Sequence, residues 1–121
     1  MEFEIVDYNA MRDALHTMCE EMQRCSIPEQ GIFDCKLVAC ELLSNVLQHG
    51  GGKAYLHAEL KGGVAFLRVR AEREWRPPDE SECSSVESER GRGLFLVDAV
   101  SESRSYSPEQ GICVTVRVIG K

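Results

Sequence analysis

The spacing of apolar residues in the first half of the chain predicts a strand followed by two helices. Residues 2–7 alternate apolar and polar side chains, as a short strand does. From residue 9 to residue 24 apolar side chains recur every three or four positions, which gives one apolar stripe on a helix that Asp7 or Asn9 can cap. Pro28 follows this helix, and a second helix is predicted from residue 28 or 30 to residue 48. Its middle is apolar almost all round, so we expect it to be buried on most sides.

The second half of the chain predicts strands, one long loop and a third helix. Residues 53–60 and 64–71 read as strands joined by a hairpin turn at Lys61-Gly62-Gly63. Residues 73–92 carry few apolar side chains, which predicts a long mobile loop of a kind that is usually functional. A helix over residues 93–102 and strands at 104–107 and 112–119 complete the chain. This order predicts an α+β two-layer sandwich, with a mixed, mostly antiparallel sheet and three helices on one face.

Length and charge narrow the functional classes. A chain of 121 residues is the size of one domain, so we expect residues 1–121 to form a single domain. The 14 basic and 20 acidic residues leave a net charge of −6, which speaks against a nucleic-acid partner. No apolar run approaches the roughly 20 residues that span a bilayer, and no basic segment opens the chain. We therefore expect no membrane association and a cytoplasmic location.

The six cysteines form no Cys-x-x-Cys pair. In the cytoplasm they are expected to be free thiols, and without tight ligand pairs a zinc site is not favoured. Cys19 and Cys40 are interpreted as small buried apolar residues on the two long helices.

Two groups of residues are candidates for chemistry. Glu41 and Asn45 share one face of the second helix, and His49 extends the row. A carboxylate in an apolar helix is costly unless it is paired, so Glu41 is either a structural group held by an arginine or a functional base or metal-linked group. Farther along, Gly91-Arg92-Gly93-Leu94 precedes a predicted helix. Such glycines either let backbone N–H groups approach a phosphate or form a simple tight turn.

Taken together, these segments resemble a known superfamily. Glu41-Leu42-Leu43-Ser44-Asn45-Val46-Leu47-Gln48-His49-Gly50 is similar to the N-box of the GHKL ATPases, which include gyrase, MutL and histidine-kinase domains. Gly91-Arg92-Gly93-Leu94-Phe95-Leu96-Val97 resembles their second glycine box. The compact length and the Glu-x3-Asn-x3-His-Gly form are most similar to the anti-sigma-factor serine/threonine kinases of bacterial partner-switching systems. The resemblance covers nearly the whole chain and implies the Bergerat-type ATP-binding fold.

The resemblance also implies roles for individual residues. It makes Glu41 the general base in phosphoryl transfer and Asn45 the ligand of Mg²⁺, with His49 and Gly50 completing the N-box around the nucleotide. The phosphates of ATP would be held by the glycine box, which consists of Gly91, Arg92, Gly93 and Leu94. The implied partners are regulatory proteins, either a sigma factor or an anti-anti-sigma-like antagonist, and the chain could form the homodimer that is usual in that family.

The sequence departs from the family where the adenine is bound. The family carries an Asp-x-Gly-x-Gly box after the strand that ends near Arg70, and this chain has Ala71, Arg73 and Trp75 at those positions. Ile112 stands where a threonine is expected. Trp75 could plug the adenine position, contact a partner or cover the sheet edge. Two functions therefore stay open: an active ATP-dependent kinase, and a degenerate, non-catalytic protein-binding module that binds ATP weakly or not at all.

Overall fold

The computed structural model describes residues 1–49, 52–73 and 96–119. The elements are β1 (Glu2–Ile5), α1 (Tyr8–Arg24), α2 (Glu29–Gln48), β2 (Ala54–Lys61), β3 (Val64–Ala71), β4 (Ser103–Ser107) and β5 (Gly111–Arg117). Residues 96–100, within the third predicted helix, are also helical. Each predicted helix and strand is thus represented in the described ranges, and the bounds that lie within these ranges differ from the expected ones by a few residues.

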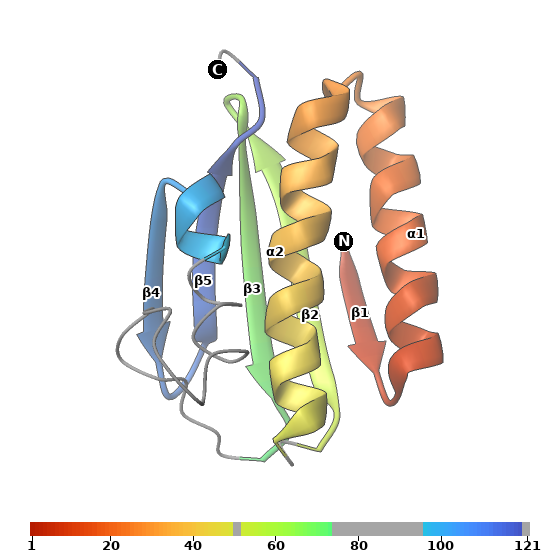
Figure 1. Ribbon diagram of the computed structural model, residues 1–121, viewed down its shortest axis with the longest axis vertical. Coiled ribbons are helices and arrows are strands. Elements are labelled where there is room, and N and C mark those ends of the chain that lie inside the picture. The colour runs from red at the N-terminus through yellow and green to blue at the C-terminus, as the bar shows by residue number, and fades with distance from the viewer. Residues whose placement is uncertain (50–51, 74–95, 120–121) are drawn as a thin grey trace.

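The five strands form one sheet in the order β1-β2-β3-β5-β4. All four pairings between these strands are antiparallel, so the parallel part of a mixed sheet is not seen among them. The reason is that α1 and α2 run side by side in opposite directions and return the chain to the end of the sheet where β1 finishes (Figure 1). The helices lie on one face of the sheet, which confirms the two-layer α+β sandwich.

Burial alternates along the strands and divides the sheet into two faces. Leu56, Leu67 and Val114 are at most 1% exposed and point toward the helices. Their neighbours in the sequence point the other way, onto a face that we call the open face. The core lies between the helix layer and the sheet.

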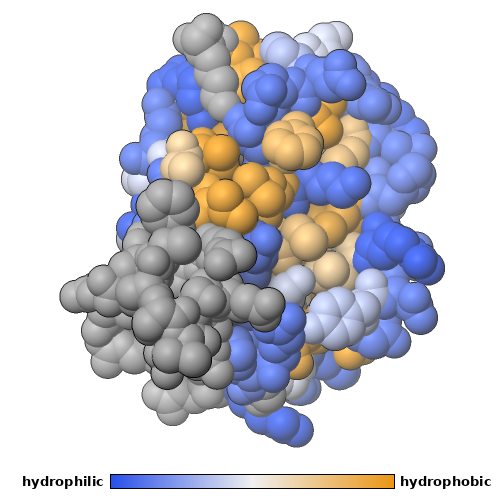
Figure 2. All heavy atoms as spheres, viewed as in Figure 1, coloured by the Kyte–Doolittle hydropathy of each residue, from blue (hydrophilic) through white to orange (hydrophobic). Residues whose placement is uncertain are grey.

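Capping and helix packing explain where the long helices begin and what they bury. The Asp7 carboxylate accepts a hydrogen bond from the backbone N–H of Ala10 at 2.8 Å, so Asp7 is the N-cap of α1. Met18 and Met22 of α1 are fully buried, and hydrophobic atoms also gather on the outer surface of the helix side (Figure 2). Phe33 of α2 is 59% exposed, so the helix layer is not covered entirely by polar side chains.

Gly111 is the point at which the β4–β5 hairpin meets β3. Its φ of +79° lies in the left-handed region, and a Cβ added there would lie 2.2 Å from the carbonyl oxygen of Val69. Gly62, in the β2–β3 turn, has a φ of +59° but nothing within 4 Å of an added Cβ. A side chain at Gly62 would therefore cost only the free energy of an unfavourable backbone conformation. A side chain at Gly111 would have the same conformational cost and would also clash with β3.

We expect Gly111→Ala to lower the free energy of unfolding by about 3 kcal/mol or more, because the new methyl group forces β5 away from β3. Gly62→Ala should cost only about 1 kcal/mol, since it meets no neighbouring atom. Urea unfolding of the two variants beside the unchanged protein measures both losses. Equal decreases in the free energy of unfolding would show that the clash with Val69 does not destabilise the Gly111→Ala variant.

Candidate functional site

Glu41 and Asn45 lie one turn apart in the C-terminal half of α2, as the sequence predicts. The Glu41 side chain is half-buried, and Asn45 is 8% exposed. Within residues 1–49, 52–73 and 96–119, neither side chain has a hydrogen-bond or ion-pair partner, and no arginine contacts Glu41. The structural interpretation of Glu41 requires such an arginine, so the described residues do not support it. The role of general base stays a prediction.

His49 ends the helix and continues the row. Its backbone N–H donates to the carbonyl oxygen of Asn45 at 3.1 Å, and its side chain is half-buried. The next predicted residue, Gly50, lies outside the described residues. The structure thus brings three of the predicted site residues together at one end of α2.

The positions of the missing adenine box lie on the helix-facing side of the sheet. Ala71 is the last residue of β3 and pairs with the fully buried Ala54. Ile112 of β5 pairs with Val69 and is 1% exposed. Both positions therefore present apolar side chains toward the helix layer, and neither can accept a hydrogen bond from a base.

Glu72, the residue that follows Ala71, is hydrogen-bonded to Lys53, the residue that precedes β2. Its carboxylate accepts a hydrogen bond from the backbone N–H of Lys53 at 3.2 Å, and its own N–H donates to the Lys53 carbonyl at 2.7 Å. A side-chain hydrogen bond to Glu4 and then the charges of Glu4 and Glu72 raise the pKa of Lys53. In this arrangement the Glu72 carboxylate helps to hold the end of β3 against the start of β2.

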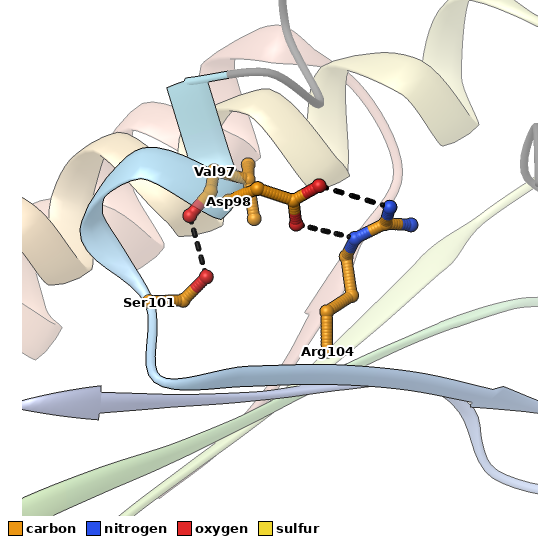
Figure 3. A network of polar contacts seen from close by, with 4 residues as sticks. All are labelled: Val97, Asp98, Ser101 and Arg104. Atoms are coloured by element: carbon orange, nitrogen blue, oxygen red, sulfur yellow. Dashed lines mark hydrogen bonds and ion pairs between the residues drawn. The ribbon is translucent and has the colours of Figure 1, made fainter. Parts of the chain in front are cut away.

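An ion pair links residues 96–100, which we call the C-terminal helix, to the edge strand β4. The Asp98 carboxylate accepts two hydrogen bonds from Arg104, at 2.7 Å from Nε and 3.1 Å from the second nitrogen (Figure 3). Ser101 donates to the Val97 carbonyl at 2.5 Å, and Val97 is fully buried. This ion pair could not be predicted from the sequence, because a single Asp and Arg six residues apart form no motif.

The predicted phosphate-binding residues directly precede this helix and lie outside the described residues, as does Trp75. They are Gly91, Arg92, Gly93 and Leu94. The predicted mobility of residues 73–92 likewise concerns a segment of which the structure describes only Arg73.

A further residue that could not be predicted from the sequence is Asp34, a carboxylate on α2 that is only 1% exposed. Gln30 donates a hydrogen bond to it from one turn earlier, at 2.9 Å. The carboxylate therefore belongs to a polar contact inside the helix layer. Nothing in its sequence context distinguishes it from an exposed helical aspartate.

Metal-ligating side chains do not cluster in the parts of the chain that the structure describes. No group of three or more His, Cys, Asp or Glu residues there is arranged to hold a metal ion. Cys19 and Cys40 lie on α1 and α2 as predicted, although both are half-buried rather than fully buried. Burial raises the pKa of the Cys19 thiol, which the nearby Lys36 charge partly offsets.

Comparison with known families decides the wider assignment. The profile described as "Histidine kinase-like ATPase domain" matches residues 6–118, nearly the whole chain. The chain belongs to this family. Domains of this superfamily generally bind ATP with Mg²⁺. A search of curated proteins gave no significant match. None of the helices in the described ranges has the length and apolar character needed to cross a membrane.

The Asp98–Arg104 pair is expected to anchor the C-terminal helix. A double-mutant cycle with Asp98→Ala and Arg104→Ala should give a coupling energy of about 1 kcal/mol, because the contact is bidentate and Arg104 is only 18% exposed. Arg117 and Glu102 make a single contact at 3.2 Å and are both more than 40% exposed, so the same cycle there should give about 0.5 kcal/mol or less. Thermal unfolding of each set measures the coupling. Equal values would show that the bidentate geometry adds nothing.

Proposed function

We propose that this protein is an ATP-binding regulatory domain of the anti-sigma-factor serine/threonine kinase type. The observation that carries the proposal is the placement of Glu41 and Asn45 one turn apart in the C-terminal half of α2. The chain that carries them belongs to the histidine kinase-like ATPase family. Its role would lie in bacterial signalling and transcription control, through protein partners.

The N-box side chains fit the phosphate and metal half of such a site. The amide oxygen of Asn45 is a suitable ligand for Mg²⁺, which usually takes few protein ligands and keeps water and phosphate oxygens for the rest. Bound Mg-ATP would supply the phosphoryl group and neutralise the charge on it.

Glu41 is suited to accept a proton from an attacking hydroxyl group. The Glu41 carboxylate is half-buried and is not engaged by a cation in the described part of the chain. A base held one turn from the proposed metal ligand would be close to a bound phosphate group, which is the placement that general-base catalysis requires. The hydroxyl group would belong to a serine or threonine of a partner protein.

The adenine half fits less well. Ala71 and Ile112 offer no hydrogen-bonding group on the helix-facing side, and Glu72 is bound to Lys53. This observation favours the second candidate, a non-catalytic protein-binding module of the same fold that binds nucleotide weakly or not at all. The two candidates share partners and fold and differ in nucleotide affinity and turnover.

We propose the same partners for both candidates: a sigma factor or an anti-anti-sigma-like antagonist, with neither nucleic acid nor membrane, in the cytoplasm. A homodimer is the proposed assembly. The net charge of −6 supports the choice of protein over nucleic acid.

Weak and unselective nucleotide binding is the first expectation for the site. Loss of one buried hydrogen bond to the base lowers affinity by about 1–3 kcal/mol, or roughly 5- to 150-fold, relative to a domain with an intact adenine box. Residual binding should depend on Mg²⁺ and discriminate poorly between ATP and GTP, since the phosphates provide most of the contacts. Isothermal titration of both nucleotides, with and without Mg²⁺, tests this. Low-micromolar binding of ATP with strong rejection of GTP would contradict it.

The second expectation concerns turnover. If the protein transfers phosphate, Glu41→Ala should slow ADP formation by roughly 10²- to 10⁴-fold with little change in nucleotide affinity, because a general base acts mainly in the transition state. Glu59→Ala, on the open face, is the matched control and should leave both quantities unchanged. A large loss of affinity at unchanged turnover would contradict the role of Glu41. Absence of turnover in the unchanged protein would select the non-catalytic module.

A further inference from the structure

The open face of the sheet carries a cationic and aromatic centre. It is formed by alternate residues of the strands that point away from the helices. Its central side chains are Tyr55 and His57 of β2, Phe66, Arg68 and Arg70 of β3, and Cys113, Thr115 and Arg117 of β5. Arg68, Arg70 and Arg117 share this face with the carboxylates of Glu2, Glu4 and Glu59.

Two of these arginines have no carboxylate partner. Arg117 contacts Glu102 at 3.2 Å, whereas Arg68 and Arg70 form no ion pair with any residue in the described ranges. Two of the acidic side chains on this face are already engaged. Glu4 contacts Lys53 at 3.0 Å, and Glu2 lies 3.7 Å from His57.

A groove runs along this cationic centre. One hollow of about 550 Å³ lies over β2, and its charged lining consists of Arg68 and Arg70 with Glu2 and Glu4. A second hollow of about 560 Å³ lies at the end of β3, near the β4–β5 turn, and its charged lining includes Arg73, Glu72 and Glu109. Tyr55 and Arg70 line both hollows, and we call the first of them, which lies on the open face, the open-face groove.

We propose that the open-face groove binds an extended acidic segment of a protein partner. Arg68 and Arg70 are two residues apart on one strand, so their guanidinium groups project from the same face at a spacing of roughly 7 Å. An extended peptide with acidic residues at alternate positions presents carboxylates at the same spacing. Each arginine can then hold one carboxylate in a bidentate contact.

One of the two arginines is already held by an aromatic ring in the groove. The Arg70 guanidinium lies 5.1 Å from the centre of the Tyr55 ring, a cation–π contact that orients the charged group before any partner arrives. Tyrosine and arginine are also the side chains that contribute most often at the centres of protein interfaces.

Charge on the borders of the groove favours an acidic protein segment over a nucleic acid. Glu2, Glu4 and Glu59 flank the arginines on one side and would repel a continuous polyanion. A peptide whose carboxylates are confined to alternate positions avoids them. A second copy of this chain related by a two-fold axis through the groove would place arginine against arginine, which disfavours that occupant.

The test uses the full chain and a fluorescein-labelled ten-residue peptide with glutamate at alternate positions. We expect this peptide to bind about tenfold more tightly than the same peptide with glutamine at each of those positions. The double variant Arg68→Ser/Arg70→Ser should weaken binding by about tenfold, whereas Arg12→Ser, the same change on the exposed side of α1, should alter it less than about twofold. Amide chemical-shift changes on peptide addition should map to β2, β3 and β5.

Several results would overturn the proposal. They are equal binding of the glutamate and glutamine peptides, an effect of Arg12→Ser as large as that of the double variant, and shift changes confined to α1 and α2. Tighter binding of a single-stranded oligonucleotide than of the acidic peptide would assign the groove to nucleic acid. A dimer in sedimentation that the double variant dissociates would assign it to a second copy. Circular dichroism of each variant checks that the fold is retained, and Arg68→Lys/Arg70→Lys should keep more binding than the serine variant.

Discussion

Burial of α2 against the sheet is the constraint on which the rest of the structure depends. Leu42 and Val46 of this helix are fully buried, and they fix how far the helix is rotated about its own axis. At the other end, a Cβ on Gly31 would lie 2.8 Å from the Cβ of Val118, so the first turn of α2 is packed tightly under the segment that follows β5. With rotation and position both set, Glu41 and Asn45 can occupy only one side of the helix. The candidate site is therefore a consequence of core packing.

The apolar periodicity of the sequence was sufficient to predict this arrangement, and the motif residues on α2 could be placed before the fold was known. Periodicity is informative here because the helices bury one stripe and the strands one face. It contains no information on strand direction, so the sequence could not decide between a mixed and an antiparallel sheet. It also could not predict the Asp98–Arg104 pair, because an Asp and an Arg six residues apart form no motif, or the close approach of Gly111 to Val69, because these residues are far apart in the sequence.

The central strand β3 gives the molecule two chemically distinct sides. Leu67 and Val69 face the core, and Arg68 between them faces the open side, so one strand contributes to both the helix-facing site and the arginine centre. The pairing of β3 with β2 and β5 fixes which residues lie on each side. Neither face can be altered by sliding the strand without disturbing the other.

This coupling of the two faces bears on the missing carboxylate at position 71. A shift of β3 by one residue would turn Glu72 toward the helix layer, where an adenine-binding group is expected. The same shift would bury Arg68 and Arg70 among apolar side chains and expose Val69, at a cost of several kcal/mol for each unpaired charge. It would also break the hydrogen bonds between Glu72 and Lys53. The register of the sheet thus opposes recruitment of Glu72 in this way, and any polar group that reads the base must come from another part of the chain.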